Sequence, residues 1–260
     1  MVNLILALFL CWLWAAPAPA RLPTAAGDDP SPPAALEGGL PGSHALVVAL
    51  HGGSFGGRPP AELARRLLTD LSSEARAAGL RLLVPIAPAV PDAVDAEHYV
   101  VPWLQPDGEA LVWSLVRRET ASRRSDPGRI LLAGHGAGAT GALTLAARHP
   151  ELVAGVAAWS GTPEPLWDDQ HHVVGLAEPV VEGLRDVPVF LFSARDDPIL
   201  DRTALGLLVE GLRAQEQATG TAQLVWLEGE GGHSFGKAGP ARGLRFLRDA
   251  GKARALEKRR

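Results

Sequence analysis

Short apolar runs alternate with amphipathic segments along most of this chain, and this alternation limits the possible folds more than any other feature. The runs read as strands buried on both faces, and they span residues 45–50, 81–86, 129–133, 152–159, 187–192 and 222–227. The segments between them repeat apolar residues at helical spacing, over residues 60–79, 107–122, 139–149, 176–185, 201–217 and from about 239. Strands that alternate with helices predict a single α/β domain with a mostly parallel sheet and helices on both faces.

The first 20 residues form an apolar leader. Residues 2–14 are almost wholly apolar, and small residues suited to signal-peptide cleavage follow up to Ala20. Because the run is too short to span a bilayer, it predicts a signal peptide and a secreted or periplasmic protein, with no stable membrane insertion after cleavage. No Lys or Arg precedes the run, so an uncleaved leader that anchors the chain to a membrane is the alternative.

Composition divides the rest of the chain. Residues 21–42 are rich in Pro, Gly and Ala and lack an apolar period, which predicts a linker. The folded domain is then expected over residues 43–252, followed by a basic C-terminal tail over 253–260. The net charge of −4 gives no reason to expect nucleic acid as a partner.

Cysteine usage excludes several kinds of site. The single cysteine, Cys11, lies in the leader, so a mature chain would have no disulfide, no cysteine-ligated metal and no thiol nucleophile. No phosphate-binding glycine loop follows a strand, so no nucleotide cofactor is expected. The adjacent pair His171 and His172 lacks a complete set of metal-ligand spacings, and no metal is predicted.

Four unusual loops each follow an expected strand. They are His51-Gly-Gly53, Gly134-His-Gly-Ala-Gly138, Arg195-Asp-Asp-Pro198 and Gly231-Gly-His-Ser-Phe235. The carboxyl ends of parallel strands meet at one edge of the sheet, where ligands bind in such folds. We therefore expect these loops to come together at one site.

From about residue 44 to 250 the chain resembles α/β-hydrolases of the secreted esterase and phospholipase/carboxylesterase type. The order of the loops matches that family: an HGG oxyanion loop, a nucleophile elbow, an acid loop and a late histidine. Residues 130–161 carry the resemblance most clearly. It implies that Asp197 is the acid and His233 the base, with Asp196 as the competing acid.

The resemblance also implies where an oxyanion would bind. In relatives, backbone amides hold it, and here these would come from Ala137 and from Gly53 or Ser54. The ligand implied is a small-molecule ester or carbonyl compound.

The centre of the elbow departs from the family. Relatives read G-x-S-x-G there, whereas Gly136 stands in the position of the serine. Glycine cannot form an acyl-enzyme, and it tolerates the strained backbone of an elbow better than serine does. The favoured interpretation is a hydrolase-fold protein of carboxylic-ester hydrolase ancestry that is catalytically impaired, a pseudoenzyme that keeps its pocket.

An active ester hydrolase is the alternative. His233 with Asp197 could activate a water molecule held in the gap at Gly136. A displaced serine such as Ser54 could also attack, whereas the hydroxyl groups of the other candidates suit turns and caps. These other candidates are Thr140, Ser160 and Ser234.

Aromatic side chains are candidates for the pocket wall. His135 lies beside the elbow centre and is expected to give packing or polar support. Trp103 and Trp159, with Trp167, are expected to shape an apolar wall, with an ordinary core position as the other interpretation.

Overall fold

A seven-stranded sheet forms the centre of the molecule. The computed structural model describes residues 35–53, 58–88, 101–221, 223–236 and 239–257. The strand order is β1-β3-β2-β4-β5-β8-β9, and every neighbouring pair is parallel except β1 and β3. The strands are β1 (Ala35–Gly39), β2 (Leu46–Leu50), β3 (Arg81–Pro85), β4 (Ile130–His135), β5 (Val156–Trp159), β8 (Val189–Ala194) and β9 (Leu224–Gly229). The mostly parallel sheet predicted from the alternation of elements is confirmed.

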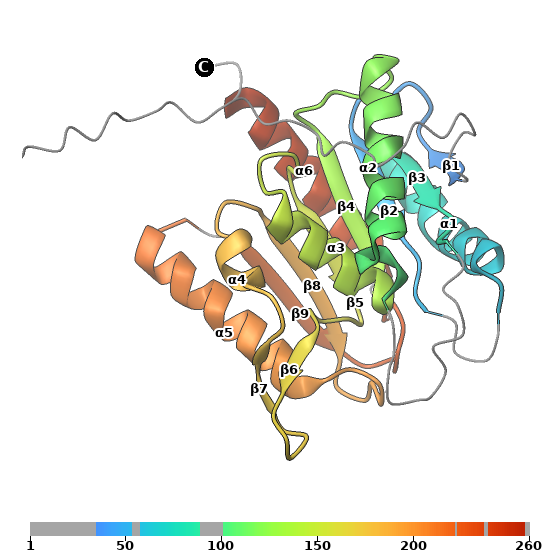
Figure 1. Ribbon diagram of the computed structural model, residues 1–260. Helices are drawn as coiled ribbons and strands as arrows, with labels where there is room; N and C mark the ends of the chain where they lie inside the picture. The colour runs from blue at the N-terminus through green and yellow to red at the C-terminus, as the bar shows by residue number, and fades with distance from the viewer. Residues whose placement is uncertain (1–34, 54–57, 89–100, 222, 237–238, 258–260) are drawn as a thin grey trace, which may run out of the picture.

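Helices cover both faces of this sheet (Figure 1). One face packs against α1 (Pro60–Ala77) and α6 (Ala241–Glu257). The other packs against α2 (Pro106–Ala121), α3 (Ala137–Arg148), α4 (Val180–Gly183) and α5 (Arg202–Thr219), with the short 3₁₀ helix η1 (Pro102–Leu104) beside α2. The two faces thus bury two separate apolar clusters, as the continuous apolar strands predict.

Strand β1 lies inside the segment expected to be a linker, so that expectation is wrong for residues 35–39. The strand pairs antiparallel with β3 and also lies against α1. Its glycines permit this close approach. A Cβ on Gly38 would lie 2.6 Å from Ser72 Oγ, and one on Gly39 would lie 2.4 Å from the Leu80 carbonyl oxygen. The domain therefore begins at least eight residues before residue 43, and residues 1–34 lie outside the described part.

The C-terminal boundary also differs from the expected one. Helix α6 continues to Glu257, so most of the segment expected as a tail is helical. Arg254 donates hydrogen bonds to the carbonyl oxygens of Pro150 and Glu151, at 3.1 and 3.3 Å. Arg254 thus attaches the last turn of α6 to the loop after α3.

A buried ion pair joins the edge of the sheet to α2. Glu119 is fully buried and accepts hydrogen bonds from Arg81, and from Arg124 at 3.0 Å. Arg124 also binds Glu37 of β1 at 2.7 Å. These contacts tie β1, β3 and α2 together at the end of the sheet away from the strand carboxyl ends.

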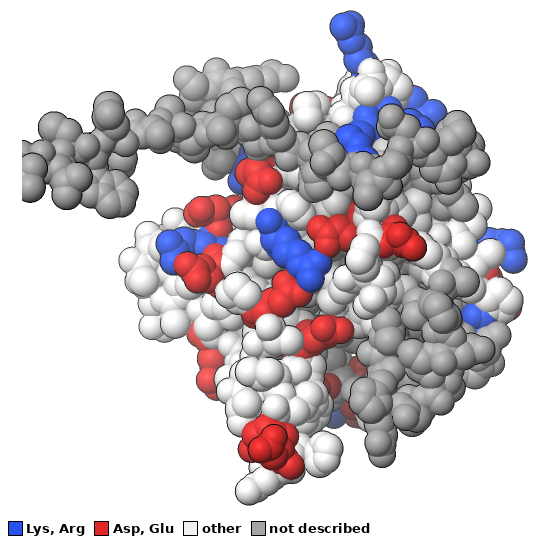
Figure 2. All heavy atoms as spheres, viewed as in Figure 1, with Lys and Arg blue, Asp and Glu red and all other residues white. Residues whose placement is uncertain are grey.

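The face covered by α2–α5 carries charges of both signs. Figure 2 shows basic side chains lying among acidic ones there. Arg148 pairs with both Glu109 and Glu178 at 2.5 Å. None of the helices in the described part of the chain combines the length and hydrophobicity needed to cross a bilayer.

A two-stranded antiparallel hairpin extends from the end of the sheet. It consists of β6 (Pro165–Trp167) and β7 (Val173–Leu176), where the sequence predicts only a loop. Leu166, Trp167 and Val174 are about half exposed on it. Figure 1 shows the hairpin projecting beyond the body of the molecule.

Candidate active site

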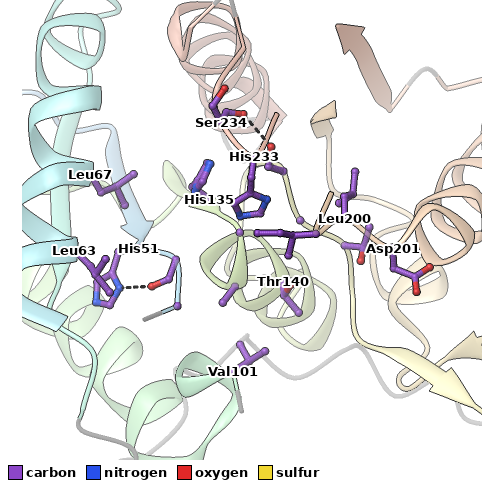
Figure 3. A pocket seen from close by; sticks show the side chains of 18 of the residues that line it. His51, Leu63, Leu67, Val101, His135, Thr140, Leu200, Asp201, His233 and Ser234 are labelled. Carbon is purple, nitrogen blue, oxygen red and sulfur yellow. Dashed lines mark hydrogen bonds between the residues drawn. The ribbon is translucent and has the colours of Figure 1, made fainter. Parts of the chain in front are cut away.

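The loops after β2, β4, β8 and β9 come together around a cavity of about 1140 Å³. Leu63 and Leu67 of α1 line one side, and Leu200 and Asp201 line the other (Figure 3). His135 and His233 lie between these walls, near the N-terminus of α3. The predicted convergence of the four loops is therefore present.

Strand β4 passes into α3 through a tight turn centred on Gly136. Its φ of +57° and ψ of −124° form a backbone conformation that favours glycine. Its amide donates to the Trp159 carbonyl at 3.0 Å, and its carbonyl accepts from the amides of Ala139 and Thr140. The turn is thus fixed by backbone hydrogen bonds that do not require a side chain at position 136.

The glycines on either side of this turn allow close packing. A Cβ on Gly134 would lie 2.0 Å from the Gly138 carbonyl oxygen, and one on Gly138 would lie 1.9 Å from that of Leu50. Neither position has room for any side chain. These two glycines therefore hold the helix N-terminus against β2 and β4 whatever residue occupies position 136.

Asp197 and His233 form a hydrogen-bonded pair, as the spacing of their loops predicts. His233 Nδ1 lies 3.0 Å from Asp197 Oδ2 and 3.2 Å from Oδ1. The carboxylate is fully buried and also accepts hydrogen bonds from the amides of Ile199 and Leu200. Since a carboxylate only accepts, Nδ1 of His233 carries a proton, and Nε2 of the neutral ring holds a lone pair.

Asp196, the competing acid, has a different task. Its Oδ1 accepts hydrogen bonds from the amides of Gly231 and Gly232, both at 3.0 Å. These bonds hold the loop that carries His233. They also lower the pKa of Asp196 below the usual value.

The imidazole of His233 lies unusually close to the position that a Cβ at residue 136 would take. A Cβ built on Gly136 would lie 2.9 Å from Nε2 and 3.5 Å from Cε1 of His233. In a serine–histidine pair with a normal Oγ–Nε2 hydrogen bond, the corresponding Cβ–Nε2 separation is about 3.5 Å. The ring therefore occupies part of the space that a side chain at position 136 would need.

His135 is a buried, neutral neighbour of this pair. Its pKa is lowered to about 4, mainly by burial and also by the charge of nearby His233, whereas Asp197 opposes the shift. Its ring meets His233 edge to face and also contacts Phe235. His135 Nε2 is buried without a hydrogen-bond partner among the described residues. This ring supports the site by packing, as the sequence predicts.

The loop after β2 is held by the side chain of His51. Its Nδ1 donates to the Gly52 carbonyl at 2.8 Å, and its Nε2 accepts from the Ala87 amide at 3.2 Å. Burial lowers the pKa of His51, against a smaller opposing effect of the bond to Gly52. Gly53 and Ala137 both line the cavity. Ala137 is the first residue of α3, where amides have no partner within the helix.

Two tryptophans expected in the pocket wall are core residues instead. Trp103 and Trp159 are fully buried, and neither lines the cavity. Trp103 Nε1 donates a hydrogen bond to the His51 carbonyl at 2.9 Å. Trp103 also packs against Gly141, where an added Cβ would lie 2.6 Å from Trp103 Cβ. Trp167, on the β6–β7 hairpin, does line the cavity. Large aromatic rings bury themselves by default, so their residue type alone is a poor marker of a pocket.

Two of the other candidate hydroxyl groups, those of Ser160 and Ser234, have structural partners. Ser160 donates to the Ser234 carbonyl at 2.9 Å, and Ser234 Oγ donates to that of Gly231 at 2.8 Å. Thr140 lines the cavity from α3. Ser54 lies outside the described residues. In the part of the chain that the structure describes, no three His, Cys, Asp or Glu residues are grouped to hold a metal ion.

One polar residue of the cavity has no sequence signal. Glu164 lines the cavity half-buried, in the loop between β5 and β6. Burial raises its pKa, the charge of Glu178 raises it further, and Arg148 opposes the shift. Its position depends on the path of a loop that no motif marks.

Comparisons with known proteins agree with this architecture. Residues 102–211 match the family model described as esterase PHB depolymerase. No curated protein sequence matches the chain. Solved structures do, including TT1662 from Thermus thermophilus, with a TM-score of 0.62 and 22% identity over 85% of this chain and 94% of that one.

Two further solved structures also share this architecture, with lower TM-scores. A phospholipase/carboxylesterase from Dyadobacter fermentans is 16% identical, with a TM-score of 0.52 over 90% of this chain and all of that one. An S-formylglutathione hydrolase from Agrobacterium tumefaciens is 17% identical, with a TM-score of 0.51 over 84% of both chains. With the parallel sheet, its two helical layers and the turn at Gly136, these likenesses show that the chain has the α/β-hydrolase fold and resembles esterases within it.

Proposed function

We propose that the cavity binds a small ester or related carbonyl compound and that the chain does not form an acyl-serine intermediate. The observation that carries this proposal is the turn at Gly136. It has the backbone of a nucleophile elbow and faces a paired histidine, but no hydroxyl group. A protein built this way is a carboxylic-ester hydrolase by ancestry with strongly reduced covalent chemistry.

Carbonyl binding would rest on backbone amides. Ala137 lies at the N-terminus of α3, and Gly53 lies in the loop opposite, both on the cavity. Amides at such a position stabilise negative charge on a carbonyl oxygen. Glycine at position 136 leaves both amides in place, so the ligand would keep its polar contacts.

A pair of substitutions at position 136 tests the proposal. The wild type should carry no fluorophosphonate label on a serine, whereas Gly136→Ser should gain labelling at position 136 and much faster turnover of p-nitrophenyl butyrate. The imidazole of His233 has to move back to admit the serine, and as the free end of a side chain it can do so. Gly136→Ala is the matched control because it adds the same Cβ without a hydroxyl group. Labelling of a wild-type serine such as Ser54, or a folded but inert Gly136→Ser variant, would contradict the proposal.

Slow ester hydrolysis without a serine is the second candidate. The intact Asp197–His233 pair favours it, since His233 could act as general base on a water molecule. His233→Ala should then abolish hydrolysis, whereas Ser54→Ala tests the displaced serine. Loss of activity in Ser54→Ala with activity kept in His233→Ala would replace the water route with that serine.

We also propose that residues 1–20 are a signal peptide that directs the chain out of the cytoplasm. Its apolar run and small residues support this, with an uncleaved membrane anchor as the alternative. Mass spectrometry of the N-terminus of the exported protein distinguishes the two. Cleavage near Ala20 supports secretion, and an intact leader in the membrane fraction supports the anchor.

A further inference from the structure

His233 has an unshared nitrogen directed at the centre of the site. Its Nδ1 is held by Asp197, and its Nε2 lies nearest to Gly136 of all ring atoms. In a serine hydrolase this nitrogen takes the serine proton and later gives it to the leaving group, while the serine oxygen attacks the carbonyl carbon. Here position 136 has no side chain to stand between this nitrogen and a carbonyl carbon bound at the helix N-terminus.

We propose that His233 itself is a nucleophile, which attacks activated acyl donors through Nε2 and becomes transiently acylated. The inference deepens the proposed function and rests on it, because the acyl donor must first bind in the cavity beside Gly136. Imidazole is an established nucleophile in enzymes, and a positioned base partner activates it. The small residue at position 136 thus changes which atom reacts.

The geometry supports attack at this position. Nε2 lies 2.9 Å from the position that a Cβ at residue 136 would take, about half an ångström closer than in a serine–histidine pair. The ring is about one-fifth exposed, so Nε2 can be reached from the cavity. The edge-to-face contact with His135 and the bond to buried Asp197 fix the ring plane. A fixed nucleophile next to bound substrate lowers the entropic cost of attack.

The reaction balances without any added reagent. The Nε2 lone pair forms a bond to the carbonyl carbon, and the carbonyl electron pair moves onto oxygen beside the Ala137 amide. When that pair returns, the carbon–oxygen bond to the leaving group breaks, and the leaving group departs with the bonding electrons. The product is an acyl-imidazolium that keeps its Nδ1 proton against the Asp197 carboxylate. Water then adds to the acyl carbon and releases a proton to solvent, and the carbon–nitrogen bond breaks to restore the free imidazole.

This chemistry selects the substrate class. Imidazole is expelled more easily than an alkoxide, so the adduct of a simple alkyl ester reverts to starting material. Of the described residues that line the cavity, the two other histidines are poor proton donors to the leaving group, because burial keeps His135 neutral and the Nδ1 proton of His51 is donated to Gly52. The substrates are therefore acyl compounds with good leaving groups, such as aryl esters, thioesters and acyl phosphates.

The test uses p-nitrophenyl acetate with the full-length protein. The wild type should release a burst of p-nitrophenol and, after acid quench, carry one acetyl group that mass spectrometry maps to His233. Hydroxylamine should remove that group. The rate of the burst should hardly change in heavy water, because nucleophilic attack transfers no proton. Ethyl acetate should not be hydrolysed. His233→Ala should lose the burst and the adduct.

Gly136→Ala provides the matched control. Its Cβ stands 2.9 Å from the present position of Nε2, so the ring must retreat and the burst rate should fall by at least about tenfold. Unfolding curves confirm that this variant folds. A burst as fast as that of the wild type would overturn the proposal.

The outcomes also separate this inference from the proposed function. The wild type could carry no acetyl group on His233 while Gly136→Ser hydrolyses the same ester. That result would contradict the assignment of His233 as nucleophile and would leave the proposed ester-binding cavity supported. A two- to threefold slower wild-type rate in heavy water, with turnover of ethyl acetate, would likewise replace the nucleophile with general-base attack by water. If folded Gly136→Ser is also inert, the proposed function falls together with this inference.

Discussion

The imidazole rings of His135 and His233 meet edge to face with their centroids 5.0 Å apart. Only His233 has a carboxylate partner, whereas His135 is buried and its pKa is lowered to about 4. Two adjacent rings of the same residue type thus have different tasks, set by burial and by one hydrogen bond.

This arrangement predicts a pH dependence of stability. In the unfolded chain His135 binds a proton near pH 6.5, whereas in the folded protein it does so only near pH 4. Between these values the unfolded state binds more protons, so the free energy of unfolding falls as the pH falls from about 6.5 to 4, by up to about 3 kcal/mol. Urea unfolding at pH 7 and pH 5 measures this loss.

His135→Phe is the variant to compare, since it keeps an aromatic ring against Phe235 and removes the titration. The loss between pH 7 and pH 5 should be smaller in this variant than in the wild type. His51, whose pKa is lowered as well, contributes a loss of the same sign to both proteins. Equal losses in the two proteins would contradict the assignment to His135.

The two neighbouring aspartates should differ sharply in their effect on catalysis. In the Gly136→Ser background, Asp197→Asn should lower kcat by about 10³- to 10⁴-fold, because the histidine loses the partner that sets its tautomer. Asp196→Asn in the same background should have a much smaller effect, since its carboxylate binds only loop amides. Ester turnover by both double variants checks this, and equal losses would show that the loop matters as much as the pairing.

Breaking the buried ion pair between Arg81 and Glu119 should lower the free energy of unfolding strongly. Glu119→Ala leaves Arg81 buried without its main partner and should cost about 3–5 kcal/mol. Arg248→Ala removes an exposed pair with Asp249 and should change the free energy of unfolding by less than about 0.5 kcal/mol. Denaturant unfolding of both variants decides the matter, and a small effect of Glu119→Ala would mean that the cluster is well hydrated.

Two glycine-to-alanine substitutions should have opposite signs. Gly138→Ala puts a Cβ 1.9 Å from the Leu50 carbonyl oxygen and should prevent or severely weaken folding. Gly206→Ala lies within α5, where a Cβ meets nothing within 4 Å, and should stabilise the protein by about 0.5–1 kcal/mol. Thermal unfolding measures both, and a tolerated Gly138→Ala would show that α3 can move away from β2.

Much of the architecture follows from local patterns. Apolar runs such as 45–50 and 187–192 predict buried parallel strands because only such strands lack a polar face. Strand β1 could not be predicted in this way, since it is short, half-buried and contains two glycines. It pairs with β3 and packs closely on α1, and glycine at both positions permits this close packing. The β6–β7 hairpin escapes for a similar reason, because its exposed side chains show no periodicity.

The site likewise has features that local sequence patterns predict and features that depend on tertiary packing. The spacing of loops relative to strands predicts that Asp197 and His233 meet, because the carboxyl ends of parallel strands share one edge. The placement of Glu164 in the cavity and the burial of Trp103 and Trp159 depend on tertiary packing. The close approach of the His233 ring to Gly136 also has no local signal, because it is set by two loops more than ninety residues apart.

The antiparallel direction of β1 determines where the leader would connect to the domain. Ala35 pairs with Pro85 at the carboxyl end of β3, so the chain enters the fold at the same edge of the sheet as the cavity. A cleaved leader makes this direction irrelevant to function. An attached leader would instead join the domain at the edge of the sheet where the cavity lies.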